Sequence, residues 1–140
     1  MAFINDSDYE VQVRSEILTL LDCKEEDGMH ALRFAEKMAM DQIRNYIGGR
    51  FDMDKVFAAE GDSRDMFIVM TTIDIALYHI WAKKAPRKIP EYRVVRYNDA
   101  LDWLKEVANG SSCNLPQLSD DNYSGDFIIE SKYRQNINKY

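Results

Sequence analysis

The chain has 140 residues, of which 46% are hydrophobic and 30% are charged, values typical of one globular domain with a buried core. Its formal net charge of -6 argues against general nucleic-acid binding, which depends on Lys and Arg, although a local basic patch is still compatible with it. No apolar run approaches the length of a transmembrane helix, and the first residues lack the basic and apolar regions of a signal peptide. Cys23 and Cys113 match no metal-binding spacing, so we expect reduced thiols in a cytoplasmic setting.

Two helices are expected in the first third of the chain. The first spans about residues 5–22, where Asn5, Asp6 or Ser7 can provide a cap and apolar residues recur at helical steps. The second spans about residues 29–47, and Gly48-Gly49 should end it because glycine adopts the left-handed conformation at no steric cost. Its apolar stripe consists of Leu32, Ala35, Ala39, Ile43, Tyr46 and Ile47.

The third expected helix is the most apolar segment of the chain. Residues 50–61 precede it and read as irregular, and Asp62 or Ser63 can cap the helix that follows over residues 66–84. Apolar side chains cover so much of its circumference that we expect it at the centre of a bundle. Its isolated polar residues are expected to face a neighbouring chain or solvent; they are Thr71, Thr72 and Asp74.

A proline corner separates this helix from a fourth. Pro86 ends the third helix, because proline disfavours helical geometry in the preceding residue, and Pro90 can begin the next at its first turn. The fourth helix runs to Gly110, with Trp103 and Val107 at the edge of a stripe formed by Val94, Tyr97, Leu101, Leu104 and Ala108. The sequence therefore predicts an all-α fold, a small four-helix domain over residues 1–110.

Residues 111–140 read as an extended C-terminal arm. Their apolar residues are sparse, with one short strand expected at residues 127–130, so the arm should become ordered against a partner. Phe127, Ile128, Ile129, Tyr133 and Tyr140 are the residues we expect to contact a neighbouring subunit or another protein.

No catalytic, cofactor-binding or metal-binding motif is recognisable. The acidic segment that begins at Asp52 and Asp54 fails the calcium-loop pattern, because Phe57 stands where an EF-hand requires glycine. Gly48-Gly49 follows a helix rather than opening one, which does not fit a phosphate loop. His79 reads as a structural histidine; the alternative is a small hydrolase that pairs His79 with Asp74 or Asp99.

The strongest charge cluster surrounds the proline corner, with Lys84, Arg87 and Lys88 at the corner itself; its members are Lys83, Lys84, Arg87, Lys88, Arg93 and Arg96. Lysines at the end of a helix also favour its negative pole, so the cluster has a purely structural interpretation. As a functional surface, it would meet an acidic partner or nearby DNA. A DNA-binding regulator with a helix–corner–helix is therefore an alternative, although two prolines at the corner and an acidic chain do not match a helix-turn-helix.

Residues 1–8, 43–51 and 93–104 each carry a recognisable motif, and in this order they resemble the Mu-like prophage gp36 family of phage head–tail connector (head completion) proteins. Residues 1–8, MAFINDSD, are similar to its opening M-x-F-I-t-x-x-D, and residues 43–51, IRNYIGGRF, to its I-d-s-Y-L-x-g-R-Y element. Residues 93–104, RVVRYNDALDWL, are similar to its R-Y-e-d-A-l-x-W-L element. The chain departs from the family at residues 52–62, which contain no proline where members often carry a proline-rich segment.

The resemblance implies a structural protein rather than an enzyme, without cofactor or metal. It would form an adaptor ring between the portal and the tail of a tailed phage or prophage, in the virion neck, and be soluble in the bacterial host cytoplasm before assembly. Its partners would be further copies of itself, the portal protein and tail-completion or neck proteins, with no membrane and with DNA passing through the channel. The basic corner would then face a partner or this channel.

Overall fold

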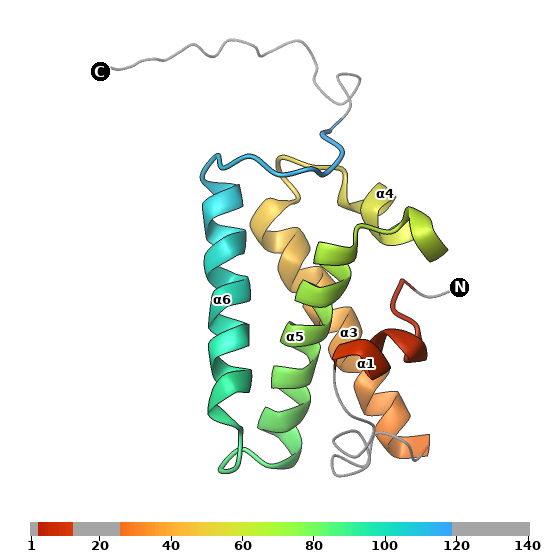
Figure 1. The fold of residues 1–140 in the computed structure, drawn as a ribbon, viewed down its shortest axis with the longest axis vertical. Helices are drawn as coiled ribbons and strands as arrows, with labels where there is room; N and C mark the ends of the chain where they lie inside the picture. Colours follow the sequence, from red (N-terminus) through yellow and green to blue (C-terminus); the bar gives the residue numbers. More distant parts are fainter. Residues whose placement is uncertain (1–2, 13–25, 119–140) are drawn as a thin grey trace.

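The computed structural model describes residues 3–12 and 26–118, which form an all-α fold without a β-strand (Figure 1). Five α-helices lie in these ranges: α1 (Asp6–Gln12), α3 (Glu26–Ile47), α4 (Met53–Ala58), α5 (Met66–Lys84) and α6 (Glu91–Ala108). A short 3₁₀ turn, η1 (Gly61–Ser63), precedes α5. Figure 1 shows α6 along one side of α5 and α3 crossing behind it.

Helix α5 is the central helix, as its composition predicts. Its contacts with α3, α6 and α1 bury residues on all sides of it, including Ile68, Ile75 and Leu77. By length and composition α5 would also pass for a membrane span, but 61% of that window is buried inside the protein, as in a core helix. The expected cap was wrong: Asp62 and Ser63 lie in η1, and Asp65 accepts hydrogen bonds from the N–H groups of Phe67 and Ile68 at 3.0 and 3.1 Å.

Helix α3 confirms the second expected helix and begins slightly earlier, at Glu26. Ile43 and Ile47, near its end, are fully buried. The helix ends at Ile47, where the N–H of Gly48 donates to the carbonyl of Arg44 at 2.8 Å. The left-handed conformation expected of Gly48 and Gly49 was wrong, because neither has a positive φ. Instead, a Cβ atom at Gly48 would lie 2.5 Å from that same oxygen, so the close approach of the backbone requires glycine here.

The first expected helix is described in part, as α1. Its start is fixed by Asp8, whose carboxylate accepts a hydrogen bond from the N–H of Asn5 at 2.7 Å, the reach-back contact of a capping box. Phe3 and Ile4 precede the helix and are buried in the core. Residues 13–22, which complete the expected helix, lie outside the described residues, as does Cys23.

The expectation of an irregular segment at residues 50–61 was wrong, because α4 forms there. The Asp52 side chain caps it by accepting a hydrogen bond from the N–H of Lys55 at 3.1 Å. Met53, Val56 and Phe57 face the core, and the Phe57 ring meets Phe3 edge to face at a centroid distance of 5.1 Å. A six-residue helix is too short to show a helical period, and tertiary packing stabilises it.

Helix α6 follows the proline corner but faces the core differently from the expected stripe. Pro90 lies just before the first helical residue rather than within the first turn. Val107, expected at the edge, is buried together with Leu104, Ala100 and Arg93. Several members of the expected stripe are only half-buried, namely Val94, Tyr97, Leu101 and Ala108. Gly110 follows with φ +119°, a conformation that favours glycine.

The first residues of the expected arm lie against the helices. Leu115 is buried, and the N–H of Asp52 donates to the carbonyl of Pro116 at 2.9 Å. Phe51 and Gln117 form an isolated antiparallel bridge. The rest of the arm, residues 119–140, lies outside the described residues, and so does the strand expected at residues 127–130.

Candidate interaction site

Asp74 is the buried acidic residue that joins α5 to α6. Its carboxylate accepts hydrogen bonds from Arg96 Nε and Nη2, both at 2.9 Å, and from Arg93 Nη1 at 3.2 Å. Asp74 and Arg93 side chains are 5% and 3% exposed. Their mutual charge compensates for the loss of hydration. The expectation that Asp74 faces solvent or another chain was therefore wrong.

Two threonines that precede Asp74 on α5 are also buried. Thr71 and Thr72 are almost inaccessible, and the Thr72 hydroxyl donates to the Ile68 carbonyl one turn earlier at 2.7 Å. A hydroxyl that bonds to its own helix can be buried without a partner in another element. The expectation of an exposed polar face on α5 was consequently wrong for these residues as well.

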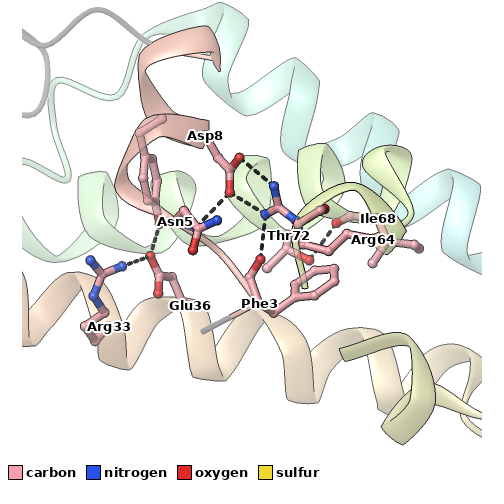
Figure 2. Close-up of polar contacts among 10 residues, drawn as sticks. Phe3, Asn5, Asp8, Arg33, Glu36, Arg64, Ile68 and Thr72 are labelled. Atoms are coloured by element: carbon pink, nitrogen blue, oxygen red, sulfur yellow. Dashed lines mark hydrogen bonds and ion pairs between the residues drawn. The ribbon is translucent and has the colours of Figure 1, made fainter. Parts of the chain in front are cut away.

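A second polar network attaches the N-terminal segment to the start of α5 (Figure 2). Arg64 Nη1 and Nη2 donate to the Asp8 carboxylate at 2.6 and 3.1 Å, and Nη1 also donates to the Phe3 carbonyl at 2.7 Å. Because of the Arg64 hydrogen bonds, the pKa of Asp8 is lowered. Arg64 could not be identified from the sequence, because its partners are 56 and 61 positions away along the chain.

Glu36 is the acidic residue of α3 that faces this network. It accepts hydrogen bonds from the Tyr9 hydroxyl and from Arg33 Nη1, the latter at 2.7 Å (Figure 2). Burial raises the pKa of the Glu36 carboxyl, against the effect of these donors. These contacts hold α1 to α3 and expose no reactive group.

His79 lies in an aromatic cluster between α3, α5 and α6. Its Nε2 is 3.1 Å from Gln42 Oε1, and the Gln42 amide donates to the Tyr97 hydroxyl at 3.2 Å. The Tyr97 ring stacks on Tyr78 at a centroid distance of 3.9 Å. Burial lowers the pKa of the His79 imidazole. The partner of His79 is thus Gln42, while the hydrolase candidate Asp74 is held by two arginines.

The basic corner, defined as Lys83, Lys84, Arg87 and Lys88, lies at the end of the molecule where α5 turns into α6 (Figure 1). All of these side chains are exposed. The turn is closed by the N–H of Lys88, which donates to the Ala85 carbonyl at 2.9 Å. No member of the corner forms an ion pair with another residue in the described ranges. Its charge is therefore available to a partner.

The arm residues expected to make contacts lie outside the described residues. They are Phe127, Ile128, Ile129, Tyr133 and Tyr140. The structure therefore does not place the arm beside the basic corner. It does show where the arm begins: the N–H of Leu118 donates to the Arg50 carbonyl at 3.4 Å, at the end of the helices opposite the corner (Figure 1).

An exposed apolar surface at the start of α5 was missed by sequence reasoning. Met66 and Phe67 are 56% and 45% exposed, and the Phe67 ring packs against Trp103 of α6 at a centroid distance of 4.7 Å. A surface cavity of about 170 Å³ adjoins this pair and reaches Arg96 and Asp99. The sequence does not distinguish the exposed positions of α5 from the buried ones, because nearly every residue of this helix is expected in the core.

Chemical and evolutionary indications of function are sparse. Within the described ranges, no cluster of three or more His, Cys, Asp or Glu side chains is suited to hold a metal ion. The larger of the surface cavities, about 600 Å³, lies between α4 and residues 114–116 and includes the ion-paired Arg64. Comparison with known protein families, with curated proteins and with solved structures finds no match for this chain.

Proposed function

We propose that this protein is a head–tail connector of a tailed phage or prophage, an adaptor that forms a ring between the portal and the tail. The observation that carries the proposal is the resemblance, in order, of residues 1–8, 43–51 and 93–104 to the Mu-like connector family. In this proposal residues 1–110 are a helical connector domain, to which α4 adds a helix beyond the four expected from the sequence, and residues 111–140 are its arm. The protein would be soluble in the host cytoplasm before it joins the virion neck.

The positions of the matching residues support a structural role. Asp8 pairs with Arg64, and Arg93 and Arg96 share Asp74, so two of the matching segments fasten helices together. Arg50, in the remaining segment (residues 43–51), donates to the carbonyls of Val107 and Ser111 and so connects the end of α3 to the end of α6. Such contacts give a rigid body on which exposed surfaces keep fixed positions.

Two features could supply the surfaces that assembly needs. The basic corner is exposed at one end of α5 and α6 and forms no ion pair within residues 3–12 and 26–118, and the chain continues into the arm after Leu118 at the other end. Charge on a rim of this kind speeds and orients association without performing chemistry. The same cations also suit duplex DNA, so a DNA-binding regulator is the second candidate.

The test combines the protein with the portal of the same phage or prophage and images the mixture by electron microscopy. The expected result is additional ring density on one face of the portal, which is lost in a Lys84→Glu/Lys88→Glu variant if the corner meets the portal. Portal particles that gain no density at any mixing ratio would contradict the connector role. A salt-dependent shift of duplex DNA by the protein, without portal binding, would support the regulator instead.

A further inference from the structure

We propose that the basic corner of one copy binds the acidic segment 119–131 of a second copy, which joins the subunits head to tail. The corner consists of Lys83, Lys84, Arg87 and Lys88, all exposed and without an ion pair to another described residue. The inference deepens the proposed ring, on which it rests, by naming the contact between its subunits.

Charge complementarity identifies the occupant. Residues 119–131 contain no Lys or Arg, and their acidic residues are Asp120, Asp121, Asp126 and Glu130. Their formal charge of -4 is thus equal in size and opposite in sign to the charge of the four corner cations. Phe127, Ile128 and Ile129 lie between the last two acidic residues. Opposite charges steer the encounter, and apolar side chains add buried area to it.

Distance separates the first two acidic residues, Asp120 and Asp121, from the corner of their own chain, whereas Asp126 and Glu130 lie far enough along the chain to reach it. The corner and the start of the arm lie at opposite ends of α6, whose 18 residues rise about 27 Å. A fully extended chain from Leu118 to Asp121 spans only about 10 Å. Asp120 and Asp121 therefore cannot reach their own corner, whereas the corner of another molecule can approach them freely.

The geometry of this contact determines the kind of assembly. Two different parts of the subunit, the basic corner and the segment that follows Leu118, meet in each contact, so the interface is heterologous. Repetition of a heterologous contact produces a closed ring when the rotation between subunits closes and a filament when it does not. Because the attraction is between exposed charges, it should weaken as salt shortens the screening length.

The first test is nuclear magnetic resonance of the isotope-labelled full chain with a synthetic peptide of residues 119–131. We expect the backbone amide signals of Lys84, Arg87 and Lys88 to move at low salt. A control peptide carries Asn or Gln in place of its four acidic residues and should leave these signals unchanged. Signals that do not move, or that move equally with the control peptide, would overturn the proposal. So would a response of the corner to duplex DNA alone.

The second test is sedimentation of the full chain over a range of concentrations without portal protein. The average mass should rise with concentration in low salt, and a Lys84→Glu/Lys88→Glu variant should need at least about tenfold more protein for the same rise. The matched control, Lys37→Glu/Lys105→Glu, has the same net charge and exposed sites, and should behave as the original chain. A chain that stays monomeric throughout overturns the proposal.

A charge exchange makes the test specific. An Asp120→Lys/Asp121→Lys variant should lose self-association, as the corner variant does, and a mixture of these two variants should regain it. Recovery in the mixture requires direct contact between corner and arm, whereas two variants that are merely misfolded would not recover. Because no portal is present, a negative result leaves the portal-binding experiment independent of it.

Discussion

Arg64 and Asp8 form an ion pair with two hydrogen bonds, and each side chain is less than 10% exposed. The pair connects the first turn of α1 to Arg64, which precedes the cap of α5, and Arg64 also holds the Phe3 carbonyl in the segment before α1. The N-terminal segment is thus held in place by Arg64, which lies 56 positions after Asp8 in the sequence (Figure 2).

Replacing Arg64 with Met should lower the free energy of unfolding by about 3 kcal/mol, because the carboxylate of Asp8 is left without its partner. The measurement is urea unfolding followed by circular dichroism. An Asp8→Asn/Arg64→Met double variant should recover part of the loss, since it no longer contains the unpaired charge. Additive losses in the double variant would show that the two side chains do not interact.

The same pair predicts a loss of stability in acid. The Arg64 hydrogen bonds lower the pKa of Asp8, so the folded state binds fewer protons there than the unfolded state. Its stabilising contribution is present above the ordinary Asp pKa of about 4 and is lost as the pH falls through the lowered value. Asp8→Asn should flatten this part of the stability profile, measured as urea midpoints from pH about 5 downwards.

His79 should make the folding stability depend on pH in a second, less acidic range. Burial lowers the pKa of its imidazole, so the folded state favours the neutral ring. Stability from this residue is complete above the ordinary His pKa of about 6.5 and falls as the pH drops through that value toward the lowered one. His79→Gln should remove this slope, whereas His30→Gln, at an exposed position, serves as the control and should retain it.

Replacing Asp74 with Asn should destabilise the protein by about 3–5 kcal/mol, because Arg93 is buried and loses its carboxylate. Asp99→Asn is the matched control on α6, since Asp99 is exposed and lines the same small cavity; it should change the unfolding free energy by less than about 0.5 kcal/mol. Equal effects of the two substitutions, measured by thermal unfolding, would contradict the role given to Asp74.

Gly110→Ala should cost about 1–2 kcal/mol, because φ +119° strains any residue with a Cβ atom even though space is available around it. Gly49→Ala provides the comparison, since an added Cβ there also meets nothing within 4 Å and no positive φ opposes it. That variant should be neutral within about 0.5 kcal/mol. Comparable losses at both positions would mean that packing, not backbone conformation, decides the outcome.

The sequence predicted the long helices well, because periodic apolar residues and strong end signals agree along them. Gly48-Gly49 ends α3, and the prolines at 86 and 90 separate α5 from α6, close to where the pattern put these boundaries. The local cap of α5 was misassigned, since Asp62, Ser63 and Asp65 are all good caps and only the path of the chain selects among them.

The buried charged residues could not be predicted, because each depends on a distant partner. Asp74 looks like a surface residue until Arg93 and Arg96 are brought beside it by the corner. Glu36 similarly depends on Tyr9, 27 positions away. The four cations of the basic corner were predictable as exposed, since they are close in sequence and proline fixes the turn between them. Arg93 and Arg96, assigned to the same cluster from the sequence, instead bond to Asp74.

The central helix also raises the question of what sets its orientation. Because α5 is apolar around most of its circumference, hydrophobic burial alone gives it little preference for one rotation about its axis. The Asp74 carboxylate removes this ambiguity, since it must point toward α6 to reach Arg93 and Arg96. Together with the contact between His79 and Gln42 of α3, this carboxylate favours one angular setting of the helix, and with it the direction in which the basic corner faces.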